Sequence, residues 1–314
     1  MKRVIIVGSG GQDGRLLSEK LRNAGHHVLG IARDSTLSSD SEQVGKVEIT
    51  DRDRVQSVVR AWRPDEVYYL AAFHHSAQDK ISPAPDELFR KSFAVHVQGL
   101  LNFLDSIRQA GIPTRLFYAA SCLIFGNTTK EIQNEETPFN PRCCYSITKT
   151  TGVHCCRLYR DTYGVFAAVG ILYNHESVFR RENFVSQKII QAAIRISKGK
   201  QETLFLGDLS ARIDWGYAPD FVEAMEQILG LDHPDDFVIA TGEPHTVQEF
   251  VEIAFEKVRL DWRHHVQIDN SLITRERSLL AGDASRLRER TGWRPSVSFE
   301  QMIERMVADQ LHAD

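Results

Sequence analysis

The feature that most constrains the fold of this chain is an apolar strand that runs directly into a glycine-rich turn and then into a helix. Val4-Ile5-Ile6-Val7 is followed by Gly8-Ser9-Gly10-Gly11-Gln12-Asp13-Gly14, and helical spacing begins at once after it. Glycines let the backbone approach a diphosphate closely, and a helix N-terminus supplies N–H donors and the positive end of a dipole. The arrangement predicts a dinucleotide-binding turn, although a glycine run alone is also typical of an ordinary tight turn.

Short apolar segments alternate with amphipathic helices through the first part of the chain. The pattern predicts strands at residues 3–7, 27–31, 66–70, 115–119 and 166–172, and helices at residues 15–24, 52–61, 92–110 and 145–163. Such alternation is typical of a doubly wound parallel Rossmann sheet, which binds ligands at the carboxyl ends of its strands. We therefore expect residues 1–173 to form an α/β dinucleotide-binding domain.

The alternation stops after about Tyr173. Helices are predicted at residues 184–199, 220–229, 246–259 and 298–312, and a strand at residues 202–207. We expect residues 174–314 to form mainly a smaller mixed C-terminal substrate lobe, with some of the chain crossing back to the sheet.

The composition excludes several classes of partner. The chain has 314 residues, 25% of them charged, with a net charge of −4, which argues against nucleic acid or an anionic membrane as its main partner. We find no stretch of the ~20 apolar residues that span a bilayer, and the N-terminus enters a strand, so we expect a cytoplasmic protein. Five cysteines, four of them in two adjacent pairs, suit neither a disulfide framework nor a metal site, and we expect no metal.

Tyr145 and Lys149 supply a candidate acid/base pair. Positions i and i+4 share one face of a helix, so the ammonium can lie near the phenol and lower its pKa. The spacing alone is common in helices. Together with the glycine turn about 130 residues earlier, it indicates hydride transfer to or from an alcohol carbon.

Longer segments carry a resemblance to a known family. The glycine turn resembles the Gly-x-x-Gly-Gln-Asp-Gly pattern of the GDP-mannose 4,6-dehydratase branch of the extended short-chain dehydrogenases/reductases. Four further segments resemble segments characteristic of the same branch: Ile171-Leu172-Tyr173-Asn174-His175-Glu176-Ser177, Asp214-Trp215-Gly216, Asp236-Phe237-Val238-Ile239-Ala240-Thr241-Gly242 and Gly292-Trp293-Arg294-Pro295. The resemblance covers nearly the whole chain.

The resemblance implies roles for individual residues. Tyr145 is expected to be the general acid/base, Lys149 to lower its pKa and bind the nicotinamide ribose, and Ser121 to hold the reacting oxygen. Other cofactor contacts are expected at Gly8, Gly11, Gln12, Asp13, Gly14, Arg33, Glu48, Leu70, Ala71 and Ala72. His96 takes the place of a family asparagine, and we interpret it as a core histidine that binds backbone groups rather than as a catalytic one.

One departure from the family bears directly on the reaction. In the dehydratases a glutamate follows two residues after the active-site hydroxyl residue, and Leu123 stands in its place here. That glutamate removes the C5 proton after oxidation at C4 and helps to expel the C6 hydroxyl, whereas leucine carries no proton. Three nearby carboxylates, Glu131, Glu135 and Glu136, are candidates for a relocated base.

Cofactor and substrate follow from the same resemblance. Arg33 at the end of the second strand favours NADP(H) over NAD(H). The preference is only slight, because Asp34 stands where a second basic residue is expected. A nucleotide-diphosphate sugar, GDP-linked by resemblance, is expected to bind Asn174, Lys188, Arg212, Arg275 and Glu276, although both arginines lie one residue out of register. The family implies a homodimer or homotetramer.

We therefore predict an NAD(P)-dependent oxidoreductase that acts at C4 of a GDP-mannose-like hexose or heptose, as a 4-dehydrogenase, a 4-keto reductase or an epimerase. A 4,6-dehydratase with a relocated base is the alternative enzyme. A catalytically silent, cofactor-binding regulatory protein is the alternative from another class, and the presence of Ser121, Tyr145 and Lys149 argues against it.

Overall fold

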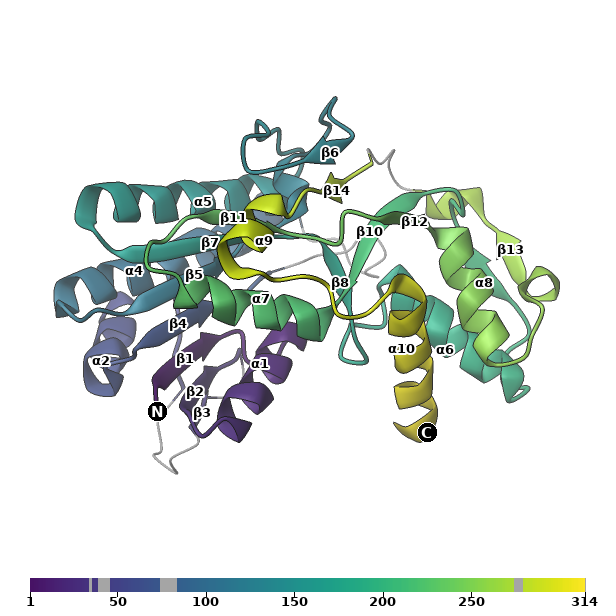
Figure 1. Ribbon diagram of the computed structural model, residues 1–314, viewed down its shortest axis with the longest axis horizontal. Coiled ribbons are helices and arrows are strands. Elements are labelled where there is room, and N and C mark those ends of the chain that lie inside the picture. Colours follow the sequence, from purple (N-terminus) through teal and green to yellow (C-terminus); the bar gives the residue numbers. More distant parts are fainter. Residues whose placement is uncertain (34–35, 39–45, 74–83, 274–278, 314) are drawn as a thin grey trace.

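A seven-stranded sheet forms the centre of the molecule (Figure 1). The computed structural model describes residues 1–33, 36–38, 46–73, 84–273 and 279–313. Six strands are parallel, and the short edge strand β3 runs antiparallel to β2. The spatial order is β11 (Asp236–Ile239), β7 (Phe166–Leu172), β5 (Arg115–Ala119), β4 (Glu66–Tyr69), β1 (Arg3–Val7), β2 (His27–Ile31) and β3 (Thr36–Ser38). The predicted doubly wound α/β fold is confirmed.

Helices cover both faces of this sheet because its strands carry apolar side chains on both sides. One face packs against α2 (Arg52–Trp62), α4 (Gly99–Ala110) and α5 (Cys144–Tyr163). The other packs against α1 (Gln12–Asn23), α7 (Ala218–Gly230) and α9 (Ser285–Thr291). Since α7, β11 and α9 all follow residue 173, the later part of the chain contributes to the sheet and to one of its helical layers.

The strand order reverses at β1, whose neighbours are β2 on one side and β4 on the other. Such a reversal leaves a crevice at the carboxyl ends of the two central strands, where open α/β sheets bind their ligands. The glycine turn begins at this point.

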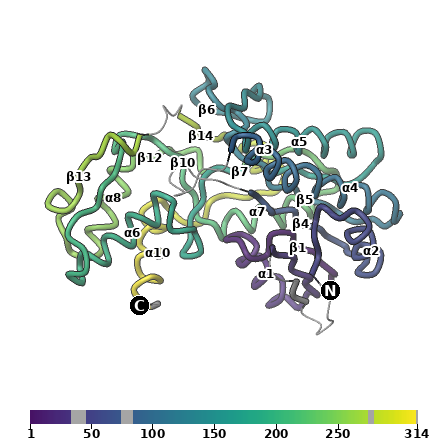
Figure 2. Tube along the Cα trace, turned by 180° about the vertical axis from the view of Figure 1, so that it is seen from behind, coloured from purple at the N-terminus to yellow at the C-terminus, as the bar shows by residue number. Residues whose placement is uncertain are grey.

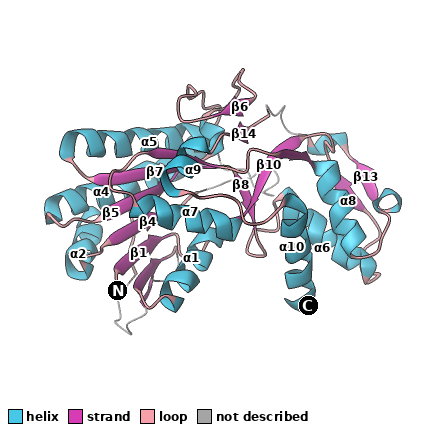
Figure 3. Cartoon of the chain, viewed as in Figure 1, coloured by secondary structure: helices cyan, strands magenta, loops and turns pink. Residues whose placement is uncertain are grey.

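Most of the remaining elements form a smaller mixed lobe beside the sheet (Figure 2 and Figure 3). Its core is built by apolar side chains of α6 (Val185–Ser197), α8 (Val247–Lys257), α10 (Phe299–Ala313), β9 (Leu204–Leu206) and β10 (Arg212–Tyr217). β10 pairs with β8 (Asn174–Glu176) and β12 (Pro244–Thr246), and β9 pairs with β13 (Val266–Ile268). Two-residue strands β6 (Ile132–Gln133) and β14 (Ala281–Gly282) pair with each other, and short 3₁₀ turns occupy Trp262–His264 and Asn270–Leu272.

The helix predicted over residues 92–110 is longer and irregular. It comprises α3 (Pro85–Phe93), a π-helical segment η1 (Ala94–Gln98) and α4. Wide turns of this kind are often found at functional sites, and this one carries the buried His96. Within the described part of the chain, no helix has both the length and the apolarity required to cross a bilayer.

Candidate active site

The glycine turn is packed so closely that only glycine fits at two of its positions. Gly8 has a φ of +98°, and a Cβ there would lie 2.7 Å from the Ala71 nitrogen. A Cβ on Gly14 would lie 2.3 Å from the Gly8 carbonyl oxygen. Helix α1 then begins after Gly11, and no described side chain caps it. Its first N–H groups therefore point toward the space in which a diphosphate would be held.

The other predicted cofactor residues lie at the same edge of the sheet. The Leu70 N–H donates to the Val7 carbonyl, which brings Leu70-Ala71-Ala72 alongside the turn. Arg33 is exposed just beyond β2, and Glu48 is exposed ahead of α2, where it accepts a hydrogen bond from the Thr50 hydroxyl. The turn, the helix end and these flanking residues fit a nicotinamide dinucleotide.

Ser121 and Tyr145 are brought together by β5 and α5. Ser121 follows the end of β5, and its Oγ accepts a hydrogen bond from the Leu123 N–H at 3.3 Å, which starts a 3₁₀ turn, η2 (Cys122–Ile124). Tyr145 lies in the first turn of α5. Burial raises the pKa of Tyr145 to about 12, while a hydrogen bond with Ser121 and the charge of Arg180 act in the opposite direction. The phenol is therefore protonated at neutral pH.

Lys149 lies one helical turn further along α5 and is 1% exposed. Its Nζ donates to the Ala119 carbonyl at 2.6 Å and lies 5.9 Å from the centroid of the Tyr145 ring. Burial lowers the pKa of Lys149 to about 7, against which Asp13 acts as a nearby negative charge. The predicted Ser121, Tyr145 and Lys149 thus form one group at the carboxyl end of β5, in which Lys149 is buried and Ser121 and Tyr145 are partly exposed.

His96 is fixed by its hydrogen bonds. Its Nε2 accepts from the Phe73 N–H at 2.9 Å, so the proton of a neutral ring lies on Nδ1, which is 2.7 Å from the Thr148 hydroxyl. The ring meets that of Tyr145 edge to face at 5.1 Å. These contacts support the interpretation of His96 as a residue that binds backbone and orients the start of α5.

The sequence did not indicate the contacts between the glycine turn and His175 in β8. Gln12 Nε2 donates to the His175 carbonyl at 2.9 Å, and His175 Nε2 lies 3.0 Å from an Asp13 carboxylate oxygen. Arg180, whose charge acts on Asp13 and Tyr145, was also missed. The signal available for Gln12, Asp13 and His175 was that two family motifs contain them, because spacing cannot reveal a contact across 162 positions. Arg180 lies outside those motifs.

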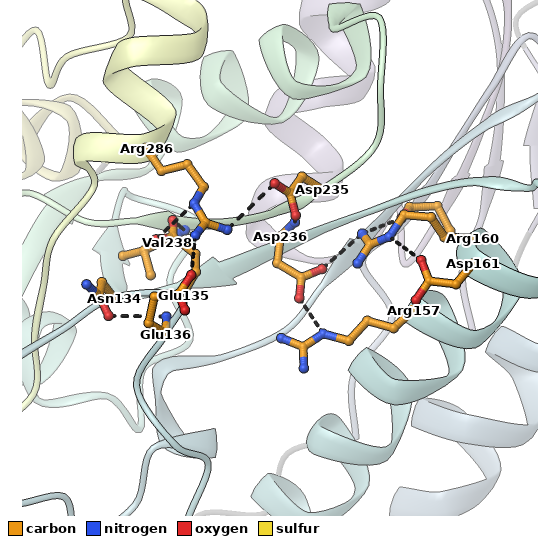
Figure 4. A network of polar contacts seen from close by, with 11 residues as sticks. Asn134, Glu135, Glu136, Arg157, Arg160, Asp161, Asp235, Asp236, Val238 and Arg286 are labelled. Atoms are coloured by element: carbon orange, nitrogen blue, oxygen red, sulfur yellow. Dashed lines mark hydrogen bonds and ion pairs between the residues drawn. The ribbon is translucent and has the colours of Figure 1, made fainter.

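Leu123 is partly exposed beside Ser121. Two of the three candidate replacements for a base, Glu135 and Glu136, are engaged elsewhere (Figure 4). Glu135 is 4% exposed and accepts from the Val238 N–H at 2.7 Å, while Glu136 pairs with Arg286 at 2.6 Å. Glu131 is exposed in the loop at β6.

Asp214 is another buried carboxylate, and its negative charge acts on Cys122. It accepts four hydrogen bonds, from the Thr241 N–H and hydroxyl and from the N–H groups of Gly242 and Gly282. Burial raises the pKa of Asp214, while the four donors act in the opposite direction. Because two donors occupy each of its oxygens, Asp214 is poorly placed to take a proton from carbon.

The predicted substrate residues that the structure describes are distributed over the smaller lobe. Asn174 begins β8 opposite Trp215, and Lys188 lies half-buried on α6, where burial lowers its pKa. Arg212 is exposed at the start of β10 and donates to the Pro244 carbonyl at 3.4 Å. Arg275 and Glu276 lie outside the described residues.

A Rossmann sheet with this glycine turn, and with serine, tyrosine and lysine gathered at its β5 edge, defines an extended short-chain dehydrogenase/reductase. The family model described as GDP-mannose 4,6 dehydratase matches residues 5–306. The chain belongs to this family and is an NAD(P)-dependent nucleotide-sugar oxidoreductase. It is 38% identical to the Arabidopsis thaliana protein GDP-mannose 4,6 dehydratase 2 over 331 residues, which cover 99% of this chain and 87% of that protein.

Solved structures share the fold at lower identity. RMD from Pseudomonas aeruginosa, complexed with NADPH, superposes with a TM-score of 0.82 at 20% identity over the full length of both chains. UDP-glucose 4-epimerase from Thermus thermophilus, in complex with NAD, gives a TM-score of 0.80 at 24% identity over 99% of this chain and 100% of the other.

Proposed function

We propose that this enzyme transfers hydride at C4 of a GDP-mannose-like nucleotide sugar without eliminating water from C5 and C6. The observation that carries the proposal is Leu123, which lies two residues after Ser121, at the position where the dehydratases have glutamate, while Ser121, Tyr145 and Lys149 are all present. Oxidation or reduction at C4 needs only that group and a nicotinamide cofactor, whereas elimination needs a further base.

The residues present support proton transfer at the C4 oxygen. Ser121 holds this oxygen, and Tyr145 donates a proton to a ketone or accepts one from an alcohol. A bound nicotinamide ring supplies or accepts the hydride. Tyr145 is protonated at neutral pH, which is the state that donates a proton to a ketone, whereas oxidation of an alcohol requires that the phenol first lose its proton.

The experiment that tests this function follows the product. With GDP-mannose or its heptose analogue, no product lighter by one water molecule should form, and no deuterium from solvent should appear at C5. When a GDP-linked 4-keto-6-deoxy sugar is supplied instead, the enzyme should oxidise the reduced cofactor, and the absorbance of the reduced nicotinamide should fall.

Mass spectrometry that detects dehydrated product from the wild-type enzyme would overturn the proposal and restore the dehydratase with a relocated base. Leu123→Glu, compared with the uncharged Leu123→Gln, tests whether a carboxylate at this position is enough for exchange at C5.

NADP(H) is the cofactor that we favour, because Arg33 is exposed at the end of β2, where the 2′-phosphate is bound in such folds. Arg33→Ala should weaken NADP binding by about tenfold, the usual worth of a charge-assisted hydrogen bond, and leave NAD binding nearly unchanged. Calorimetric titration of both dinucleotides measures this difference. Arg22→Ala, at an exposed position on α1, is the control, and equal losses for the two dinucleotides with Arg33→Ala would remove the preference.

GDP as the nucleotide, self-association and a cytoplasmic location remain predictions. Self-association is supported by apolar side chains exposed on two helices that pack together, Phe89 and Phe93 on α3 and Ile147 and Leu158 on α5. Neighbouring apolar residues of this kind are typical of a contact between subunits.

A further inference from the structure

The start of α1 and residues 175–179, at the end of β8 and directly after it, are joined by side chains to which the proposed reaction assigns no step. Gln12 contacts both the His175 carbonyl and the Ser177 hydroxyl, each at 2.9 Å. Asp13 contacts the His175 ring at 3.0 Å. The Arg15 guanidinium lies 5.6 Å from the centroid of the Phe179 ring. We call these six residues the clasp: Gln12, Asp13 and Arg15 on one side, and His175, Ser177 and Phe179 on the other.

The Asp13–His175 contact is an ion pair. His175 Nδ1 lies 2.6 Å from the Tyr173 carbonyl, which only accepts, so this nitrogen carries a proton. Nε2 faces a carboxylate and carries the second proton. Burial opposes both charges, but the nearby opposite charge and the hydrogen bonds of each group together outweigh burial. The pKa of Asp13 is therefore lowered and that of His175 is raised. Arg180 and Lys149 are further cations that interact with Asp13.

The clasp continues into α6. Gln187 Nε2 donates to the Ser177 carbonyl at 2.9 Å, and the Ser186 hydroxyl donates to Glu176 at 2.6 Å. Gln187 directly precedes Lys188, a candidate contact for the nucleotide sugar, and Ser186 lies two residues before it. A continuous series of polar contacts therefore runs from the backbone that would hold the dinucleotide diphosphate to the helix that would hold the second nucleotide.

We propose that the clasp couples the two binding sites, so that a nicotinamide dinucleotide and a nucleotide-diphosphate sugar bind cooperatively. Gln12 and Asp13 are positioning residues: their N–H groups lie at the helix start that would hold the diphosphate, while their side chains contact His175 and Ser177. A first ligand that immobilises α1 also orders this segment, and the second ligand then binds to an ordered surface. The inference rests on the proposed function only in requiring that both ligands bind.

Calorimetry with NADP⁺ and GDP tests the coupling. In the wild-type protein, saturating NADP⁺ should strengthen GDP binding by about five- to tenfold, and GDP should strengthen NADP⁺ binding by the same factor. In Gln12→Met, which keeps the shape but loses both hydrogen bonds, and in Asp13→Asn, the factor should fall below about two. The measured quantity is the coupling factor and not the affinity for either ligand alone, because Gln12 and Asp13 also lie in the turn expected to bind the cofactor.

Lys20→Gln is the matched control. Lys20 lies on the same helix but pairs with Glu223 and Glu226 of α7, so its loss should leave the coupling factor intact. Two results would overturn the inference: independent binding of the two ligands to the wild-type protein, or an undiminished factor in Gln12→Met and Asp13→Asn. If neither NADP⁺ nor NAD⁺ binds the wild-type protein at all, the proposed function fails as well, so the two failures can be told apart.

Discussion

Tyr145→Phe should lower turnover by about 10²–10⁴-fold, the usual contribution of a positioned general acid or base. The substitution removes only the phenolic oxygen, and the ring remains packed against His96, so the fold and cofactor binding should persist. Steady-state rates measured with the 4-keto sugar and reduced cofactor, together with the cofactor dissociation constant, check both parts of this expectation.

Tyr163→Phe provides the control, because Tyr163 is an exposed tyrosine at the end of the same helix. Activity of Tyr145→Phe within a few-fold of the wild-type enzyme would show that another group transfers the proton at C4.

Lys149→Met should abolish most activity and yet stabilise the folded protein near neutral pH. Burial lowers the pKa of Lys149 from 10.5 to about 7, whereas the unfolded chain keeps the ordinary value. Between these two pH values the unfolded state binds more protons, so the contribution of this group to stability rises with pH. A pKa difference of one corresponds to about 1.4 kcal/mol, so the buried ammonium costs a few kcal/mol below pH 7.

Methionine removes that cost but leaves the Ala119 carbonyl without its donor, a loss of about 1–3 kcal/mol. The variant should therefore be the more stable protein at pH 6, and its advantage should shrink or reverse by pH 10. Urea denaturation of both proteins across this range measures the difference in the free energy of unfolding. Lys200→Met, at an exposed position, should change stability by less than about 0.5 kcal/mol at every pH. A difference for Lys149→Met that does not vary with pH would contradict the assigned cause.

Apolar runs were sufficient to predict most of the large sheet. Four strands, Arg3–Val7, His27–Ile31, Arg115–Ala119 and Phe166–Leu172, have the bounds that the sequence indicated. Buried parallel strands produce continuous apolar segments, which are easy to recognise.

The helices predicted after residue 173 also lie close to their observed bounds, whereas three other elements were harder to predict for physical reasons. β8 (Asn174–Glu176) and β10 (Arg212–Tyr217) carry polar side chains whose burial depends on partners far along the chain. α3 (Pro85–Phe93) is amphipathic but mostly exposed, so its apolar signal is weak.

The candidate site divides in the same way. Tyr145 and Lys149 lie four residues apart on one helix, so local spacing reveals them. The Asp13–His175 ion pair and the approach of Arg180 to Tyr145 are tertiary contacts between distant segments, and local spacing does not reveal them.

The bond between Glu135 and the Val238 N–H has a consequence for solubility. β11 is the outermost strand of the large sheet, and outermost strands offer unpaired backbone groups to which another chain can add. Here a buried carboxylate occupies one of those donors, and Arg286, which also contacts Glu136 and Asp235, holds charged side chains over the same stretch. These side chains thus protect the side of β11 that faces away from β7, so that no extra strand is needed there to prevent strand addition and aggregation.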